Sequence, residues 1–204
     1  NLLELERGSI IGTSSIRRRS QVLNLRSDLH IKLIRGNVDT RINKLDQGQY
    51  AALILGYGGI KRLGLENRAS QIFSTDEILP PACQATIGIQ TLDEDSELIN
   101  LVTKTNHEYS SVVGLAERKV LEILEANCNS PIGVFACIQN ENFFKIRAEL
   151  FSHDGTEKYE AESYGKIKDS IDLANEVGTA IVNKVGLDYI KELDNLKNDF
   201  NYSP

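Results

Sequence analysis

The stretch Gly12-Thr13-Ser14-Ser15-Ile16-Arg17-Arg18-Arg19 decides the fold of the first half of the chain. It follows the apolar run 9–11 and opens a segment, 16–25, whose apolar residues suit a helix with one buried side. A strand, a glycine turn and a hydroxyl-capped helix start leave backbone N–H groups pointing outward at the positive end of a helix dipole. The octet therefore predicts an anion-binding corner. The alternative is a capped surface helix with a solvated basic face.

The same order of elements occurs twice more. Residues 31–34 read as a second strand followed by a helix over 38–46, and residues 51–55 as a third strand followed by a glycine-rich turn and a short helix. This alternation predicts a doubly wound α/β unit with a parallel sheet, in which ligands bind at the carboxyl ends of the strands.

Basic side chains follow each of the three expected strands. They are Arg17 and Arg18 after the first, Arg35 and Arg41 after the second, and Lys61 and Arg62 after the third. Guanidinium groups bind carboxylate or phosphate in two-point contacts. Because the carboxyl ends of parallel strands share one edge, we expect these groups to converge on a pocket for a ligand with several carboxylates.

The charge of the chain is unevenly distributed. The 204 residues carry a net charge of −6, but residues 1–70 hold 12 basic and 6 acidic side chains. An acidic protein with one basic third is a poor general nucleic-acid binder, and RNA binding through Arg17–Arg19 lacks an aromatic stacking platform. The basic third indicates a local site for a small anion. No apolar run approaches the roughly 18 residues needed to span a bilayer, so no membrane contact is expected.

The cysteines Cys83, Cys128 and Cys137 form no C-x-x-C pair, and the three histidines fall in separate segments. We therefore expect no disulfide framework, no metal site and a reducing cytoplasm. The chain begins at Asn1 and contains no methionine, so we expect the native start to lie upstream.

The second half reads as a small α+β domain with a three-stranded antiparallel sheet. The expected elements are a strand over 86–92, a helix over 96–104, a long helix capped by Ser110 or Ser111 and running to Ala126 with Asn127 as C-cap, strands over 132–139, 143–152 and 158–164, a helix capped by Asp169 or Ser170 and running toward Gly186, and a polar, frayed end over 194–204.

Cys128 stands just past the long helix, in the turn Asn127-Cys128-Asn129-Ser130-Pro131. A free cysteine is usually a small buried hydrophobe, and the negative end of a helix dipole should raise a thiol pKa. If Cys128 does chemistry, it is better suited to one permanent covalent attachment than to turning over as a nucleophile.

Five motifs, in order and spacing, together resemble the hydroxymethylbilane synthase (porphobilinogen deaminase) family. They are Gly12-Thr13-Ser14-Ser15-Ile16-Arg17-Arg18, Arg35-Gly36-Asn37-Val38-Asp39-Thr40-Arg41, Lys44-Leu45-Asp46, Gly59-Ile60-Lys61-Arg62-Leu63-Gly64-Leu65 and Cys128-Asn129-Ser130-Pro131-Ile132. The resemblance implies three α/β-type domains around a cleft. The first two are similar to periplasmic-binding-protein lobes, and the third carries a dipyrromethane cofactor on a cysteine through a thioether.

The resemblance assigns roles by matching motif position. It makes Cys128 the attachment point and Gln84 a residue of an interdomain hinge. The residues that it places around the carboxylates of the cofactor and growing chain are Thr13, Ser15, Arg17, Arg18, Asn37 and Arg41. Arg35, Arg41 and Arg62 would meet incoming porphobilinogen and extended intermediates. The implied enzyme is a monomeric cytoplasmic transferase. It joins four porphobilinogen molecules head to tail, losing ammonia each time, to give linear hydroxymethylbilane on the route to haem.

The same resemblance divides the chain into 1–82, a lobe with the anion and cofactor pocket; 83–105, the hinge and a returning strand and helix of a first domain that is mostly missing; and 106–204, the C-terminal domain. It implies that the catalytic aspartate belongs to the missing part, so this chain alone should be inactive. The chain has Ala82-Cys83-Gln84-Ala85 where the family usually has Val-Gly-Gln-Gly. The alternative function is a non-enzymatic small-anion-binding lobe of the periplasmic-binding type, which would not need Cys128.

Overall fold

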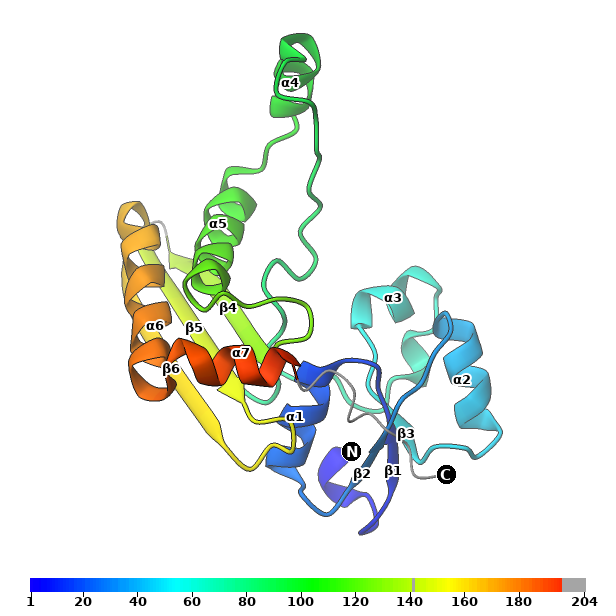
Figure 1. The fold of residues 1–204 in the computed structure, drawn as a ribbon. Coiled ribbons are helices and arrows are strands. Elements are labelled where there is room, and N and C mark those ends of the chain that lie inside the picture. The colour runs from blue at the N-terminus through cyan, green and yellow to red at the C-terminus, as the bar shows by residue number, and fades with distance from the viewer. Residues whose placement is uncertain (141, 196–204) are drawn as a thin grey trace.

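The computed structural model describes residues 1–140 and 142–195 (Figure 1). In the first half, three short parallel strands form a sheet in the order β2-β1-β3. The elements are a 3-10 turn η1 (Leu2–Glu4), β1 (Ile10–Gly12), α1 (Ile16–Leu25), β2 (His30–Lys32), α2 (Val38–Asp46), β3 (Ala52–Leu53), α3 (Tyr57–Arg62) and a 3-10 turn η2 (Glu66–Arg68). The predicted parallel α/β unit is confirmed, with a third strand shorter than expected.

The centre of this lobe is a small apolar core. Ile11 on β1 and Val22 on α1 are completely buried, and Leu29 and Ile54 pack with them. Gly12 ends β1 where the sheet is tightest, since a Cβ there would lie 2.5 Å from Leu53 Cδ2. The glycine therefore allows the first strand to approach the third and to turn into α1.

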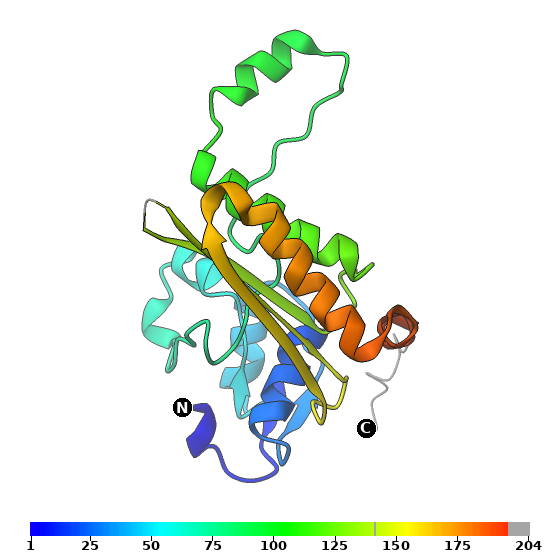
Figure 2. The same cartoon turned by 90° about the vertical axis from the view of Figure 1, so that its left-hand side faces the viewer.

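The second half contains an antiparallel sheet in the order β4-β5-β6, as predicted. Its elements are α5 (Glu108–Ile123), β4 (Ile132–Asn140), β5 (Phe143–Phe151), β6 (Lys158–Lys166), a 3-10 turn η3 (Ile167–Asp169), α6 (Ser170–Val185) and α7 (Leu187–Asn195). Helices α5 and α6 cover one face of the sheet, and α1 of the lobe lies against the other (Figures 1 and 2). Alternate residues of β5, including Phe144 and Ile146, are completely buried in the core under α5 and α6.

The predicted ends of the long helix were wrong. Helix α5 begins at Glu108 with His107 as its N-cap, because His107 Nδ1 accepts the backbone N–H of Ser110 at 3.3 Å. It ends at Ile123 with Leu124 as C-cap, so Asn127 is free for other bonds. Both predicted ends of α6 are confirmed, since Asp169 is its N-cap and Gly186 its C-cap, although the Asp169 side chain makes no capping bond. Helix α7 was not predicted, and it includes Asp194 and Asn195, so the frayed end predicted from residue 194 was wrong at these two positions. The rest of that prediction, 196–204, lies outside the described residues.

The predicted strand over 86–92 was also wrong. These residues form an extended arm that leads to α4 (Ser96–Thr103), which lies far from both sheets (Figure 1). Ile87 is 85% exposed and Leu92 74% exposed. Strand propensity alone was not sufficient here, because a strand needs a neighbour to pair with its backbone groups. Within the part of the chain that the structure describes, no helix has the length and apolar character needed to cross a membrane.

Residues 78–84 form a linker that contacts three elements. Gln21 of α1 binds both polar groups of the Leu79 backbone: its Oε1 accepts the Leu79 N–H at 2.6 Å and its Nε2 donates to the Leu79 carbonyl at 3.0 Å. The Pro80 carbonyl accepts the N–H of Val134 of β4 at 2.9 Å. Glu117 of α5 accepts the N–H of Cys83 at 2.6 Å. The lobe and the C-terminal domain are therefore joined by ordered backbone contacts.

The end of this linker is strained. Cys83 has a φ of 58° and Ala85 a φ of 67°. By the resemblance described above, these are the two positions at which glycine is expected in that family. A side chain in this left-handed region costs about 1–2 kcal/mol, which glycine avoids.

Replacing Ala85 by glycine should stabilise the chain. The relief of about 1–2 kcal/mol of strain exceeds the cost of about 0.4–1 kcal/mol from the extra freedom of glycine in the unfolded state. We expect Ala85→Gly to raise the free energy of unfolding by about 0.5–1 kcal/mol, as measured by urea denaturation. Ala69, whose φ is −82°, provides the control. Ala69→Gly should be destabilising, and equal effects of the two substitutions would contradict the strain assignment.

Candidate anion and cofactor site

The start of α1 is built as the sequence predicted. Ser15 is the N-cap, and its Oγ accepts the N–H of Arg18 at 3.4 Å. Thr13 is completely buried, and its Oγ1 accepts the N–H of Ser15 at 3.2 Å. Both predicted hydroxyl residues therefore hold the turn between β1 and α1, which sets the direction of the arginines that follow.

Arg17 and Arg18 lie on the first turn of α1. Arg17 is only 7% exposed, and its guanidinium donates to the Leu79 carbonyl. Burial, together with the positive charge of Arg18, lowers the pKa of Arg17 to about 9. Burial, followed by the charge of Arg41, also lowers the pKa of Arg18, whose Nη1 donates to the Ile54 carbonyl at 3.2 Å. Two cations are thus partly withdrawn from water beside each other.

Arg41 of α2 completes this group. Its Nη1 donates to Ser14 Oγ at 3.2 Å and its Nε to the Gly36 carbonyl at 2.7 Å. Among residues 1–140 and 142–195, none of Arg17, Arg18 and Arg41 has a carboxylate within ion-pair distance. A buried charge without a partner is unfavourable. We call these three residues the arginine cluster; it is a site that an anionic ligand would stabilise.

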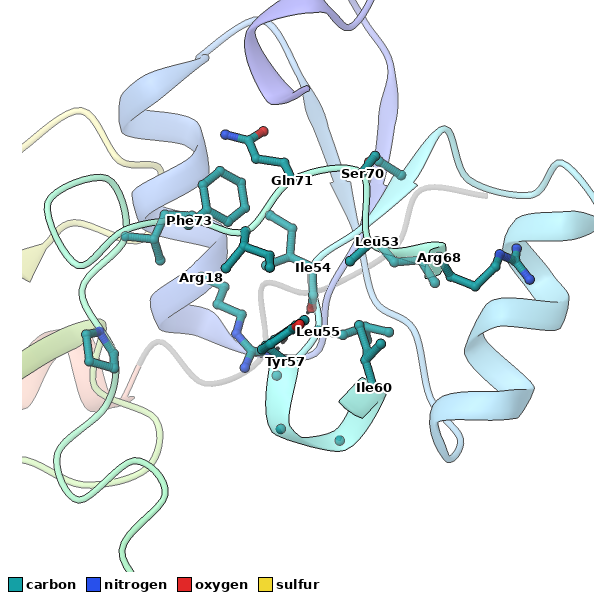
Figure 3. Close-up of a pocket in the computed structure, with 18 of the residues that line it drawn as sticks. Arg18, Leu53, Ile54, Leu55, Tyr57, Ile60, Arg68, Ser70, Gln71 and Phe73 are labelled. Atoms are coloured by element: carbon teal, nitrogen blue, oxygen red, sulfur yellow. Dashed lines mark hydrogen bonds between the residues drawn. The ribbon is translucent and has the colours of Figure 1, made fainter. Parts of the chain in front are cut away.

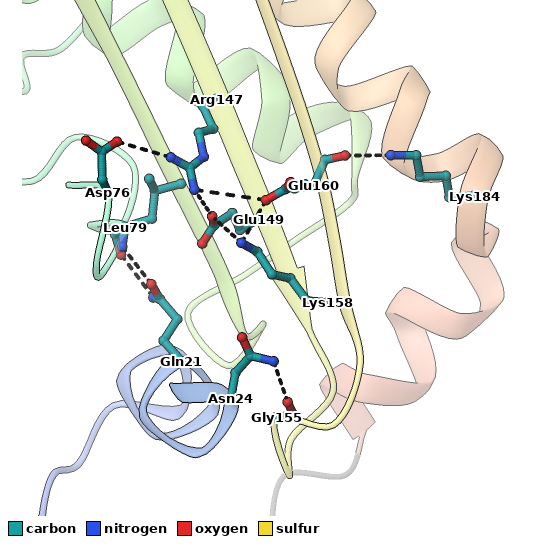
Figure 4. Close-up of polar contacts among 10 residues, drawn as sticks. All are labelled: Gln21, Asn24, Asp76, Leu79, Arg147, Glu149, Gly155, Lys158, Glu160 and Lys184. Carbon is teal, nitrogen blue, oxygen red and sulfur yellow. Dashed lines mark hydrogen bonds and ion pairs between the residues drawn. The ribbon is translucent and has the colours of Figure 1, made fainter. Parts of the chain in front are cut away.

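A buried carboxylate elsewhere in the chain, unlike the arginine cluster, has partners of opposite charge. Glu149 on β5 has a side chain only 5% exposed, and it pairs with Arg147 and, at 2.9 Å, with Lys158 (Figure 4). Arg147 also reaches Asp76 at 3.3 Å. The missing partners at the arginine cluster are therefore a local feature of the lobe.

The other predicted residues are more dispersed. Arg35 is exposed, and Arg62 is exposed at the end of α3. Asn37 caps α2, where its Oδ1 accepts the N–H of Thr40 at 2.9 Å. Gln84 lies exposed in the linker between the two strained residues. Of these four residues, Asn37 contacts the arginine cluster, since its carbonyl accepts the N–H of Arg41 at 3.1 Å. The hydrogen bonds described for the side chains of Arg35, Arg62 and Gln84 do not reach the cluster.

A cavity of about 790 Å³ opens beside the arginine cluster (Figure 3). Arg17, Arg18, Arg62 and Gln84 line it, together with a mainly apolar wall that includes Ile54, Tyr57 and Phe73. This volume is typical of small-molecule sites. Sequence reasoning missed the apolar wall, although the position of Tyr57 directly after the third strand was a usable signal. Apolar surface beside unpaired guanidinium groups suits a ligand with flat rings and carboxylates.

Cys128 is exposed, whereas Cys83 and Cys137 are partly buried. Burial raises the thiol pKa of both Cys83 and Cys137. The interpretation of Cys128 as a buried small hydrophobe is therefore excluded. Cys128 is the most exposed of the three cysteines.

The turn around Cys128 is held by Asp194 of α7. Asp194 accepts hydrogen bonds from Asn127 Nδ2 at 2.6 Å and from Ser130 Oγ at 2.5 Å. Ser130 Oγ in turn accepts the N–H of Asn127 at 2.8 Å. Because α7 was not foreseen, sequence reasoning missed Asp194. The exposed sulfur therefore projects from a constrained turn.

Contacts through Leu79 bring this turn toward the arginine cluster. Arg17 binds the Leu79 carbonyl, and Leu79 packs so closely on Gly133 that a Cβ there would lie 2.6 Å from Leu79 Cβ. In Figures 1 and 2 the connection between α5 and β4 also comes near the start of α1. Cys128 itself is not among the described residues that line the cavity. A group fixed to its sulfur would approach the arginines from outside, and the donor chemistry fits a dipyrrole with carboxylate arms.

Comparisons with known proteins agree with this geometry. The profile described as "Porphobilinogen deaminase, dipyromethane cofactor binding domain" matches residues 1–100, and "Porphobilinogen deaminase, C-terminal domain" matches residues 112–183.

Curated relatives carry the same name. Porphobilinogen deaminase of Staphylococcus epidermidis is 38% identical over 195 residues, which is 95% of this chain and 62% of the relative. That of Nitrobacter hamburgensis is 37% identical over 186 residues, 91% of this chain and 58% of the relative. The chloroplastic protein of Oryza sativa subsp. japonica is 33% identical over 195 residues, 95% of this chain and 54% of the relative. This chain thus spans little more than half the length of these relatives, and over that length it belongs to the porphobilinogen deaminase family.

Proposed function

We propose that this chain supplies the carboxylate-binding lobe and the cofactor-bearing domain of a hydroxymethylbilane synthase. The proposed reaction joins four porphobilinogen molecules head to tail, with loss of one ammonia at each step. The observation that carries this proposal is the arginine cluster, which is half-buried or more and has no carboxylate partner in the described chain. Family membership supplies the identity of the anion.

Cys128 is the residue that we propose holds the dipyrromethane cofactor. Its sulfur is exposed, its turn is constrained by Asp194, and it needs no thiolate activation for a single permanent attachment. When bound, the cofactor supplies the pyrrole end to which the substrate units are joined. The chain's own part is to fix the sulfur and to bind carboxylates.

The arginines divide the binding work. Arg17, Arg18 and Arg41, with Thr13, Ser15 and Asn37 shaping the turns around them, would hold acetate and propionate groups. The exposed Arg35 and Arg62 would meet incoming porphobilinogen, and Gln84 lies at the linker between the lobe and the arm. Guanidinium groups orient these carboxylates by two-point contacts and leave the pyrrole rings to the apolar wall of the cavity.

The acid-base step needs a group that this site does not provide. No aspartate or glutamate lines the cavity within the described residues. We therefore propose that the proton-handling carboxylate lies in a segment of the family's first domain that this chain does not contain. We also propose a reducing cytoplasm, which the three cysteines without a disulfide support, and a monomer, which rests on the resemblance alone.

Intact mass tests the role of Cys128. We expect the product of the complete coding sequence, purified from cells, to carry one adduct of dipyrromethane mass. Cys128→Ser should remove this adduct, because the thioether has no sulfur to form on. Cys137→Ser, which changes a partly buried thiol on β4, should keep it. An unmodified Cys128 in the parent protein would favour the alternative, a small-anion-binding lobe without enzymatic activity.

Removing one guanidinium tests the arginine cluster. We expect Arg18→Gln to weaken binding of uroporphyrin, an octacarboxylate probe, to the 204-residue chain by about 10- to 100-fold, because hydrogen bonds to charged groups contribute about 1.5–3 kcal/mol. Arg118→Gln, which changes the same charge at an exposed position of α5, should leave the affinity within about twofold of the parent. Absorbance titration measures both. Equal losses in the two variants would mean that only net charge matters.

The separation of the binding and acid-base groups predicts the activity of the chain. We expect the 204-residue chain alone to consume no porphobilinogen above background in an assay for released ammonia. Mixing it with a segment corresponding to the family's first domain should restore turnover. Ammonia release by the isolated chain would refute the placement of the acid-base group elsewhere.

A further inference from the structure

The turn between β5 and β6, residues 152–157, sits directly on the backbone of α1. Gly155 has a φ of 73°, and a Cβ there would lie 2.5 Å from the Ser20 carbonyl oxygen, 2.6 Å from the Asn24 nitrogen and 2.9 Å from the Leu23 carbonyl carbon. All three are main-chain atoms of a helix, which cannot move aside as a flexible side chain would. Glycine is therefore what allows this contact.

Polar bonds fix the same contact. Asn24 Nδ2 donates to the Gly155 carbonyl at 2.8 Å, as Figure 4 shows, and Ser20 Oγ donates to the His153 carbonyl at 3.3 Å. Ser20 and Asn24 are four residues apart, and Arg17 precedes Ser20 by three, so the three share one side of α1. The helix that begins with the arginines is thus held at its far end by the C-terminal domain.

The turn is itself rigid. Asp154 Oδ1 accepts the Ser152 hydroxyl at 2.6 Å and both the hydroxyl and the N–H of Thr156, at 2.8 and 3.1 Å. The Ser152 and Thr156 bonds hold the pKa of Asp154 below its usual range. Tyr189 of α7 donates to Glu157 at 2.5 Å. Helix α7 therefore braces this turn with Tyr189 and the turn of Cys128 with Asp194.

The two turns also lie at one end of the antiparallel sheet. Ile132 at the start of β4 pairs with Leu150 near the end of β5, and the N–H of Phe151 donates to the Pro131 carbonyl at 3.1 Å. The 152–157 turn, which contacts α1, and the turn that contains Cys128 therefore lie at the same end of the antiparallel sheet.

We propose that the 152–157 turn is a positioning element, in which Gly155 and Asn24 hold the arginine-bearing start of α1 at a fixed separation from the Cys128 sulfur. The proposal rests on the proposed function, because only a ligand bound at both ends requires that separation. Gly155 and Asn24 act through α1 and touch no ligand themselves. The chemical class served is a sulfur-tethered oligopyrrole with carboxylate arms.

The chain offers a matched pair of glycines for the test. Gly48, at the end of α2, has the same φ of 73° as Gly155, but a Cβ there would meet nothing within 4 Å. Gly155→Ala and Gly48→Ala therefore introduce the same backbone strain, and only the first disturbs α1. Asn24→Ala removes the bond to Gly155 without a clash and carries the test if Gly155→Ala does not fold.

The first measurement is a distance between the lobe and the C-terminal domain. Spin labels would be placed on the exposed residues Asn43 of α2 and Thr179 of α6, both changed to cysteine, with Cys83, Cys128 and Cys137 changed to serine. Pulsed electron resonance should give one narrow distance distribution for this parent and for Gly48→Ala. Gly155→Ala and Asn24→Ala should shift or broaden it.

The second measurement is the fraction of Cys128 that carries the adduct, from intact mass of the complete coding sequence product with its native cysteines. We expect about a tenfold lower fraction in Gly155→Ala, since a misplacement of about 1 Å costs up to ~100-fold in rate, and no change in Gly48→Ala. An unchanged distance distribution, or a changed one with full adduct, overturns the proposal. Unmodified Cys128 in the parent instead contradicts the proposed function, and the distance measurement then still decides whether the turn holds α1.

Discussion

The arrangement of this chain depends on the contacts that Leu79 makes through its backbone and its side chain. Gln21 satisfies both its N–H and its carbonyl, Arg17 binds the same carbonyl, and the side chain is 1% exposed against Gly133. An unsatisfied amide in such a buried position would cost about 1–3 kcal/mol. The linker is consequently fixed to α1 on one side and to β4 on the other, so the lobe cannot rotate freely against the antiparallel sheet.

This arrangement gives α1 two functions. Its first turn presents guanidinium groups, while Gln21 and Asn24 farther along bind the linker and the C-terminal domain. A helix of ten residues is about 15 Å long and stiff, so its two ends cannot move independently. Bringing Arg17, Arg18 and Arg41 together is electrostatically unfavourable. Contacts elsewhere in the fold hold these arginines in place, as the surrounding structure does at strained functional sites. A carboxylate ligand would find these donors already oriented and would lose less entropy on binding.

Local sequence signals predicted most of the helices and strands. The features that could not be predicted depend on contacts between residues far apart in the chain. The hydroxyl cap at Ser15, the three strand-to-helix turns and the antiparallel hairpins follow from spacing and turn chemistry within a few residues. The burial of Arg17 under Leu79 and the hold of Asp194 on Asn127 join residues 62 and 67 positions apart, so no local pattern encodes them. The failed strand over 86–92 has the same cause, since its pairing depended on a neighbour that the local sequence does not specify.

The linker holds two residues in strained backbone conformations, and one of them is fixed by a contact to α5. Cys83 and Ala85 occupy left-handed conformations that glycine would adopt without strain, yet Cys83 is held there by Glu117, which also accepts the N–H of Ala136 at 2.8 Å. Burial raises the pKa of the Glu117 carboxyl, and the hydrogen bonds from the N–H groups of Cys83 and Ala136 partly oppose this shift. Burying the charged form of Glu117 is therefore unfavourable. A side chain at position 83 narrows the backbone freedom that glycine would give. The residues beyond Ala85 are extended and exposed, with Ile87 at 85% and Leu92 at 74% exposure. We therefore expect the arm to move at these residues and not at Cys83, because few packed contacts hold them.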